Sequence, residues 1–426
     1  MEILSRPGIV IVLVLWILPH ILFLRLVTVG FCKNTLVICI VCLATVYAIK
    51  PVTFDLPKYS SYLASGHFAW LPYSYSKETG LVLNSSDTTG DPFVQAYPYD
   101  RAFVQLARGL HHLLPSGPYL PRVAAGHYRY VSDFQVIAIS ILGLFILMLA
   151  CLVARRAMLA KKSIAQTILY CLPIVMGSVF FMIGSQNAVR QFLGMSVILL
   201  ALSLFAKRQY LIALILIVLA TSLHHWSIVF GIFCLVATIG IRFVTATNKH
   251  SSSISAFLKY MTLGLTIGAC AVVGIKLIIS GSLNYIDMFQ YISANTSYFG
   301  ELKQYGLMNM SELLSRSGAE KKLILVGILF LVSELILGRT RSINDFDIRS
   351  FRVVTYSFLI PLSIYPELMS RVLLFYFGVE ILFICWAVMR EERRARLAGW
   401  IVFMGHGFAL NSINVLIGSE WLYSFA

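Results

Sequence analysis

Residues 185–194 read SQNAVRQFLG and place polar side chains at the edge of a strongly apolar stretch. Asn187, Arg190 and Gln191 are three or four residues apart, so an α-helix presents all three on one face. The planar guanidinium fork of arginine suits phosphate oxygens, and amide side chains can orient a phosphate or a sugar. This stretch therefore predicts an anion-binding surface at the end of a helix.

A pair of histidines follows at a matching distance beyond a short turn. Seventeen residues separate Arg190 from Lys207, which lies in the turn KRQ, and seventeen more lead to His224 in LHHWS. At about 1.5 Å per residue, two antiparallel helices of that length bring Arg190 level with His224 and His225. We therefore expect the arginine and the histidine pair to meet at one membrane face.

Two further charged groups are expected at the same face. Asp55 follows an apolar stretch in KPVTFDLPKYSSY, and Arg371 opens another in PELMSRVLLFYFG. An aspartate or a neutral histidine can remove a proton from an attacking hydroxyl, and two arginines can clamp a diphosphate. Each residue alone also fits a simpler role, because arginines at helix ends reach lipid headgroups and His-Trp pairs occur at interfaces. Their convergence favours a functional site.

The elements that carry these residues are expected to be membrane-spanning helices. Of the 426 residues, 58% are hydrophobic and 12% charged, with a mean hydropathy of +0.81. Charged residues make up about a quarter of a soluble domain, and apolar runs of about 20 residues recur along this chain. The composition excludes a soluble globule and predicts an all-α, polytopic integral membrane protein, with residues 1–426 in a single transmembrane domain.

The net charge of +15 does not indicate nucleic-acid binding. Basic clusters, such as RR at 155–156 and KR at 207–208, lie in short links between apolar runs. That distribution is typical of the cytoplasmic links of a membrane protein. The expected partner of this charge is the lipid bilayer, and no nucleic acid is expected.

Twelve spans are predicted, and placing the basic links inside puts both termini and two long loops on the non-cytoplasmic side. The loops cover residues 50–131 and 280–321, and the first apolar run is expected to be retained because it lacks a small-residue cleavage site. The spans are expected at residues 7–24, 35–49, 132–153, 164–184, 191–206, 210–223, 227–246, 259–279, 322–338, 353–366, 371–389 and 398–417.

The loop 50–131 is rich in tyrosine, whose rings stack on sugars but also form interfacial belts, and composition leaves both interpretations open. The eight cysteines fall in or beside spans and show neither a disulfide framework nor a zinc spacing. Glu380 and His406 lie about half-way along two spans, where they are expected to form a buried pair or a proton path. Glu334, nearer a span end, is expected to be paired or to reach the interface.

The stretch NAVRQFLGMSVILLALSLFAKRQYLIALILIVLATSLHHWSIVF resembles the central signature of the EpsG/Wzy-type polysaccharide polymerases. In that signature an Asn-x-x-Arg-Gln opening is followed, after two apolar arms, by a histidine. The segments FDLPKYSSY, YPYDRAFVQL and MSRVLLFYF resemble further family segments in the same order. The likeness covers most of the chain, with generic spans between the motifs.

The resemblance implies a GT-C-like helical architecture and a set of site residues. Arg190 and Arg371 would bind the diphosphate, and Asp55 or His225, with His224 as an alternative alignment, would act in catalysis. The loop sequence YPYDRAF differs from the Glu-Pro-Gly that members tend to have, which leaves the role of Asp100 open. The expected substrate-orienting residues are Asn187, Gln191, Tyr59 and Asp100.

The resemblance further implies polymerisation of undecaprenyl-diphosphate-linked oligosaccharide repeat units on the outer face of a bacterial inner membrane. The product would be O-antigen, capsule or exopolysaccharide, and a flippase and a chain-length regulator are the expected protein partners. Since two arginines can neutralise a diphosphate, neither a metal nor a cofactor is expected.

Three alternatives stay open at this point. A transferase that uses a sugar on polyprenyl phosphate would release a monophosphate, and a ligase would move finished polymer to another acceptor. A lipid-linked oligosaccharide flippase needs polar groups along a transmembrane path. The clustering of polar residues at one face favours transfer, whereas Glu380 and His406 favour transport.

Overall fold

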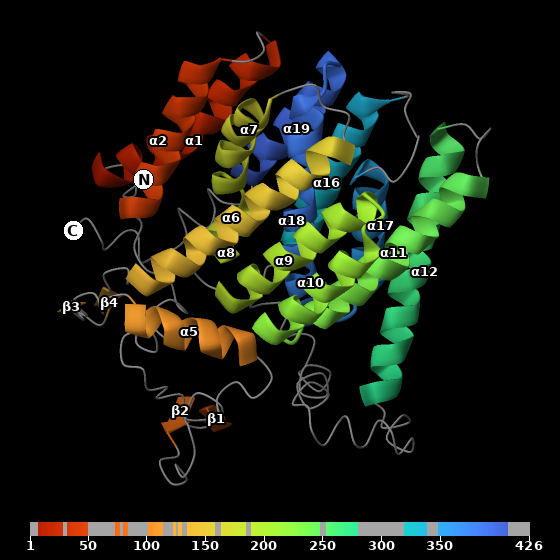
Figure 1. The fold of residues 1–426 in the computed structure, drawn as a ribbon, viewed down its shortest axis with the longest axis horizontal. Helices are drawn as coiled ribbons and strands as arrows, with labels where there is room; N and C mark the ends of the chain where they lie inside the picture. The colour runs from red at the N-terminus through yellow and green to blue at the C-terminus, as the bar shows by residue number, and fades with distance from the viewer. Residues whose placement is uncertain are drawn as a thin grey trace.

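The structure, a computed structural model, describes the following residues of the 426-residue chain: 7–28, 32–49, 73–76, 80–83, 101–113, 122–124, 127–129, 134–157, 163–184, 189–247, 253–279, 319–338 and 348–407. Helices dominate these residues and pack into one bundle (Figure 1). The helices are α1 (Pro7–Thr28), α2 (Lys33–Ile49), α5 (Arg101–Leu113), α6 (Phe134–Ala157), α7 (Ile164–Met176), α8 (Val179–Gly184), α9 (Val189–Ala206), α10 (Tyr210–Leu223), α11 (Ser227–Thr247), α12 (Ser253–Ile279), α16 (Ala319–Leu337), α17 (Ile348–Leu362), α18 (Pro366–Met389) and α19 (Arg393–Met404).

Every predicted span coincides, at least in part, with a helix. By length and apolar composition, α6, α9, α11, α12 and α18 are the five described helices able to cross a membrane. Helices α2, α7 and α10 are apolar but shorter, and α1 and α16 contain the shorter apolar stretches Leu13–Arg25 and Leu323–Leu337. These helices indicate a membrane-embedded helical protein. The finer expectation of twelve crossings remains a prediction.

The predicted span 164–184 is wrong as a single helix, because the chain breaks between α7 and α8. Pro173 lies near the end of α7, and the backbone N–H of Gly177 bonds to the Pro173 carbonyl at 2.8 Å. Ser178 then caps α8, since its Oγ accepts a hydrogen bond from the Phe181 N–H at 3.1 Å. Proline and glycine close together end the first helix, and the serine starts the second.

Several other span boundaries also differ from the predictions, and α12 begins at Ser253 rather than at 259. Helix α17 begins at Ile348 rather than at 353, so its first turns include Arg349 and Arg352, which lie outside the predicted span. Helix α19 covers Arg393–Met404, whereas the predicted span was 398–417. Residues 408–417 lie outside the described residues.

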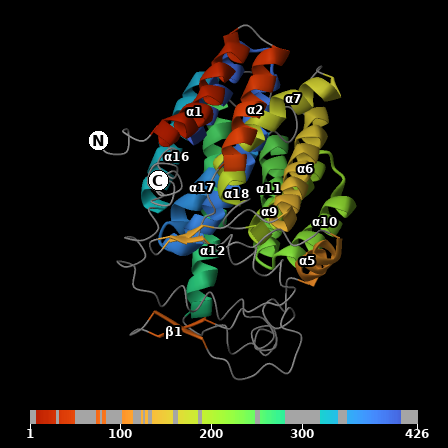
Figure 2. The same cartoon turned by 90° about the vertical axis from the view of Figure 1, so that its left-hand side faces the viewer.

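The predicted loop 50–131 contains regular structure in the parts that the structure describes. Two antiparallel hairpins occur there, β1 (Tyr73–Ser76) with β2 (Gly80–Leu83) and β3 (Arg122–Ala124) with β4 (His127–Arg129). Helix α5 is amphipathic: Phe103 is fully buried, and Leu106 and Leu110 pack on the core from the same face. This helix lies across one end of the bundle, where it contacts α10 and α6 (Figures 1 and 2).

Helix α18 is the central element of the bundle. Its most apolar stretch is 100% buried, against 22% for α12, which lies at the right-hand edge in Figure 1. Helix α18 packs against α6, α7, α8, α9, α16, α17 and α19. A substitution in α18 is therefore expected to disturb the packing of several of these helices at once.

Three helices of this bundle run parallel and begin at the same end. Trp226 and Phe230 of α11 face Arg371 and Phe375 of α18 in that order, so the two helices point the same way. Gly194 of α9 lies beside Ser227 at the start of α11, and the carbonyl of Phe205 accepts a bond from Arg242 Nη2 at 2.8 Å near its end. We call the end at which α9, α11 and α18 begin, at Val189, Ser227 and Pro366, the site end.

Helices α12 and α17 approach each other closely through two glycines. A Cβ added at Gly264 would collide with the Val354 carbonyl oxygen, and one at Gly268 would lie 2.7 Å from the Phe358 carbonyl oxygen. Gly264 and Gly268 form a small-xxx-small pair, which lets helix backbones pack tightly where lipid provides no hydrophobic drive for association.

Replacing Gly264 by alanine should lower the thermal unfolding temperature in detergent, because overpacking against backbone costs about 1–3 kcal/mol. The matched control is Gly274→Ala on the same helix, since nothing lies within 4 Å of a Cβ at Gly274. That control should be neutral or slightly stabilising. Equal unfolding temperatures for the two variants would contradict the packing assignment.

Candidate functional site

Arg371 lies in the first turns of α18, where it contacts the start of α11. Its guanidinium carbon is 5.2 Å from the centre of the Trp226 ring. One turn further along both helices, the rings of Phe230 and Phe375 stack at 4.9 Å. A cation held over an indole face keeps its charge while one side is shielded. The aromatic contacts therefore fix Arg371 at the site end.

The two histidines form the corner between α10 and α11. His224 has extended backbone at the end of α10, and its carbonyl accepts a bond from the Ser227 N–H at 2.8 Å. The rings of His224 and His225 meet edge to face with centroids 5.1 Å apart, and His225 is 6.4 Å from the Trp226 ring. His224 is buried and His225 is partly buried. The corner thus places both imidazoles beside the aromatic support of Arg371.

Arg190 and Gln191 approach this corner from α9. Gly194, one turn beyond Arg190, lies so close that an added Cβ would touch Ser227 Oγ and come within 3.2 Å of His224 Cβ. The lack of a side chain at Gly194 allows the first turns of α9 to lie against the histidine corner. Arg190, partly buried, therefore belongs to the same end of the bundle as Arg371 and the histidines.

The buried polar atoms at this end include Gln191 Nε2 and Ser227 Oγ, which have no hydrogen-bond partner among the described residues. Buried polar groups are normally paired, so each such atom needs an explanation, and a bound ligand is one. An amide N–H beside an arginine can bind an anionic oxygen.

The structure places five of the sequence-predicted site residues at the same end of the bundle: Arg190, Gln191, His224, His225 and Arg371. The other four, Asp55, Tyr59, Asp100 and Asn187, lie outside the described residues, so their roles stay predictions.

A second polar cluster lies buried in the middle of the bundle. Glu380 of α18 is fully buried and accepts hydrogen bonds from Arg352 Nη2 at 2.8 Å and from the Tyr376 hydroxyl at 2.7 Å. Its other carboxylate oxygen lies 2.5 Å from His406 Nε2. The expected pairing of Glu380 with His406 is therefore present, with Arg352 as an additional partner.

Arg352 extends this cluster to α16. Its Nη1 donates to Ser333 Oγ at 2.8 Å and to Glu334 Oε1 at 3.2 Å, while Arg349 Nε donates to the other oxygen of Glu334 at 2.7 Å. The Arg352 guanidinium also lies 4.0 Å from the centre of the Phe383 ring. Buried charges are tolerated only with this density of partners.

Sequence reasoning missed Arg352, because its segment DIRSFRVV resembles the other basic links. The available signal was the spacing of Arg349 and Arg352, because a helix places two residues three apart on one face. In the structure this face lies against Glu334 of α16 and, through Arg352, against Glu380 of α18. The sequence also gave no indication that Cys151, Cys171 and Cys385 meet, which they do in the structure.

Comparisons of the chain with protein-family models, with curated proteins and with solved structures give no match. The interpretation of the site therefore depends on its own geometry and on the motifs of the sequence.

Arg352→Met should lower the free energy of unfolding by about 3–5 kcal/mol, because the buried Glu380 carboxylate loses its arginine partner and keeps only Tyr376 and His406. The double variant Arg352→Met/Glu380→Gln removes both charges and should cost less than the sum of the two single variants. Thermal or denaturant unfolding in detergent measures both effects.

Arg349→Met is the matched control for this cycle. The Arg349 side chain is 20% exposed, and its loss leaves Glu334 paired with Arg352, so a smaller effect is expected. Strictly additive losses in the double variant would show that Arg352 and Glu380 do not act as a pair.

Proposed function

We propose that this chain is a membrane-embedded glycosyltransferase that polymerises undecaprenyl-diphosphate-linked oligosaccharide repeat units. The observation that carries the proposal is the convergence of Arg190, Gln191, His224, His225 and Arg371 at the site end of the bundle. Two arginines and a pair of imidazoles at one end of apolar helices suit a substrate whose diphosphate lies at the headgroup level and whose tail lies in lipid.

In the proposed reaction, a hydroxyl of the incoming repeat unit attacks the anomeric carbon of the growing chain. The new glycosidic C–O bond forms as the bond from the anomeric carbon to the diphosphate breaks, and undecaprenyl diphosphate leaves. Arg190 and Arg371 stabilise the negative charge that develops on the leaving diphosphate, which is a transition-state role. The hydroxyl proton passes to a base, for which His225 and Asp55 are the candidates, with His224 beside them.

The remaining residues are proposed to orient the substrate. Gln191 Nε2 has no hydrogen-bond partner among the described residues, which suits a bond to a phosphate or sugar oxygen. Asn187, Tyr59 and Asp100 are assigned the same kind of role on the sequence resemblance alone.

The wider setting of the proposal also follows from the resemblance. It comprises a GT-C-like architecture, the bacterial inner membrane with the site end facing the periplasm or exterior, and a product that is O-antigen, capsule or exopolysaccharide. A flippase would supply the lipid-linked units, and a chain-length regulator would act on the product. A ligase, or a transferase that uses a polyprenyl monophosphate, would share the same arginines and differ in acceptor or released lipid.

One observation favours a second candidate, a lipid-linked oligosaccharide flippase. The ion network of Arg349, Glu334, Arg352, Glu380 and His406 places charged groups deep among α16, α17 and α18. Intramembrane charges often mark transport paths. We rank this candidate second because the network is internally paired, which a structural role also explains.

Arg190→Ala should leave the protein in the membrane and reduce the surface polymer to single repeat units, because the leaving diphosphate loses a cation. Arg371→Lys, which keeps the charge but not the planar fork, should shorten the polymer less than Arg371→Ala. Gel profiles of the polymer from cells with equal expression measure both effects. The control is Arg394→Ala, an exposed arginine in the first turn of α19, and normal chain lengths in Arg190→Ala would refute the assigned role.

Asp55→Asn and His225→Ala separate the two candidate bases. The variant that lacks the base should lose polymer formation while it still binds lipid-linked substrate, because proton removal matters only in the reaction. The measurement is binding of purified protein to labelled lipid-linked oligosaccharide beside a polymerisation assay that identifies the released lipid. Release of a monophosphate, or movement of labelled lipid across vesicles without polymer, would support the alternative activities instead.

A further inference from the structure

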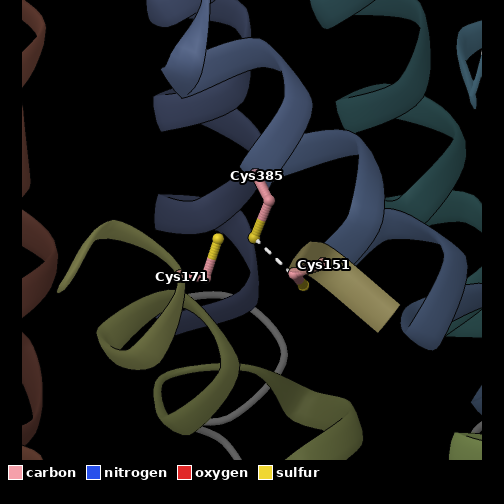
Figure 3. A group of neighbouring side chains, drawn as sticks. All are labelled: Cys151, Cys171 and Cys385. Atoms are coloured by element: carbon pink, nitrogen blue, oxygen red, sulfur yellow. Dashed lines mark hydrogen bonds between the residues drawn. The ribbon is translucent and has the colours of Figure 1, made fainter. Parts of the chain in front are cut away.

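Three cysteines from distant parts of the sequence meet inside the bundle. Cys151 of α6, Cys171 of α7 and Cys385 of α18 are all fully buried, and their sulfur atoms lie within 4.8 Å of one another. Cys151 Sγ lies 3.8 Å from Cys385 Sγ (Figure 3). Buried cysteines often serve as small apolar side chains, but three thiols in mutual contact from three helices need a further explanation.

This cluster is separate from the candidate transferase site. Cys385 is fourteen residues beyond Arg371 on α18, which is about 21 Å along the helix axis. Cys385 lies four residues before the end of α18, which is at Met389. Cys151 likewise lies six residues before the end of α6, which is at Ala157. The cluster thus lies toward the end of the bundle opposite the site end.

The spacing of the sulfur atoms matches a three-coordinate soft metal. With a metal–thiolate bond of about 2.3 Å, three sulfur ligands in a trigonal arrangement lie about 4 Å apart. The sulfur atoms of Cys151 and Cys385, 3.8 Å apart, are already near this value. Because all three sulfur atoms lie within 4.8 Å of one another, they need to move by less than about 1 Å to bind one ion. No disulfide links these thiols among the described cysteines.

The donor set distinguishes among metals. Thiolates select soft ions such as Cu(I) and Zn(II), and structural zinc sites require four ligands in a tetrahedron. Among the described residues, no fourth histidine, cysteine, aspartate or glutamate joins the group. A monovalent ion also needs less compensating charge than a divalent ion in an apolar interior, because loss of one thiol proton makes its complex neutral.

We propose that Cys151, Cys171 and Cys385 form a three-sulfur binding site for Cu(I). Cu(I) bonds to all three sulfur atoms while one of the three thiols loses its proton to solvent, so the complex is neutral. Copper remains Cu(I), and the step needs no oxidant or reductant. Bound copper links α6, α7 and α18. The proposal is independent of the transferase activity.

The test is a titration of purified, reduced, full-length protein with Cu(I) in detergent under anaerobic conditions, in competition with a chromophoric Cu(I) chelator. One ion per chain is expected. Each of Cys151→Ser, Cys171→Ser and Cys385→Ser should weaken binding by roughly 10–100-fold or more, since even outer partners of metal ligands have effects of that size. Stronger binding of Zn(II) than of Cu(I) would overturn the assignment.

Cys234→Ser is the matched control, because Cys234 is also fully buried but lies in α11, outside the cluster. Binding lost equally in this variant, or unchanged in the three cluster variants, would overturn the proposal. Should a cluster variant fail to fold, X-ray absorption of copper-loaded wild-type protein decides the question. A shell of three sulfur atoms supports the site, and a two-coordinate or nitrogen- and oxygen-containing shell refutes it.

Discussion

The structure depends on the pairing of one carboxylate, Glu380, at the middle of its central helix. An ionised carboxylate in an apolar interior is costly unless partners surround it, and here Arg352, Tyr376 and His406 all bond to it. Arg352 comes from α17, Tyr376 from the preceding turn of α18, and His406 from the segment after α19. The helices that carry them must therefore keep one register and one rotation for the charge to stay compensated. Glu380 thus defines where α17 and the segment after α19 lie against α18.

The same helix connects three chemically different regions. Arg371 is at one end of α18, Glu380 at its middle, and Cys385 near the other end. Because α18 is buried along its whole apolar length, it cannot rotate or slide without disturbing all three. A rigid central helix suits the proposed transferase site, which would hold a charged lipid headgroup in a fixed position, since misplacement of reacting groups lowers the rate.

Part of this arrangement could be predicted from the sequence, because it depends on length alone. Two arms of equal length around KRQ bring Arg190 and His224 to one level, and α9 and α10 do form that hairpin. The position of Arg352 could not be predicted, because a basic residue near a span end resembles a topology signal until its acidic partners are known. The meeting of the three cysteines could not be predicted either. Helices α6 and α18 are apolar around most of their circumference, so periodicity does not reveal which of their side chains face each other.

The parallel course of α9, α11 and α18 has an electrostatic consequence of its own. Every α-helix carries a partial positive charge at its N-terminus, where backbone N–H groups lack intrahelical partners. Three such termini, at Val189, Ser227 and Pro366, open at the site end beside Arg190 and Arg371. The C-termini of α10 and α17, at Leu223 and Leu362, lie at the same level and offset part of this charge, and the first N–H groups of α11 already bond to the carbonyls of residues 224–226. The arginine side chains therefore supply most of the attraction for anions at this end.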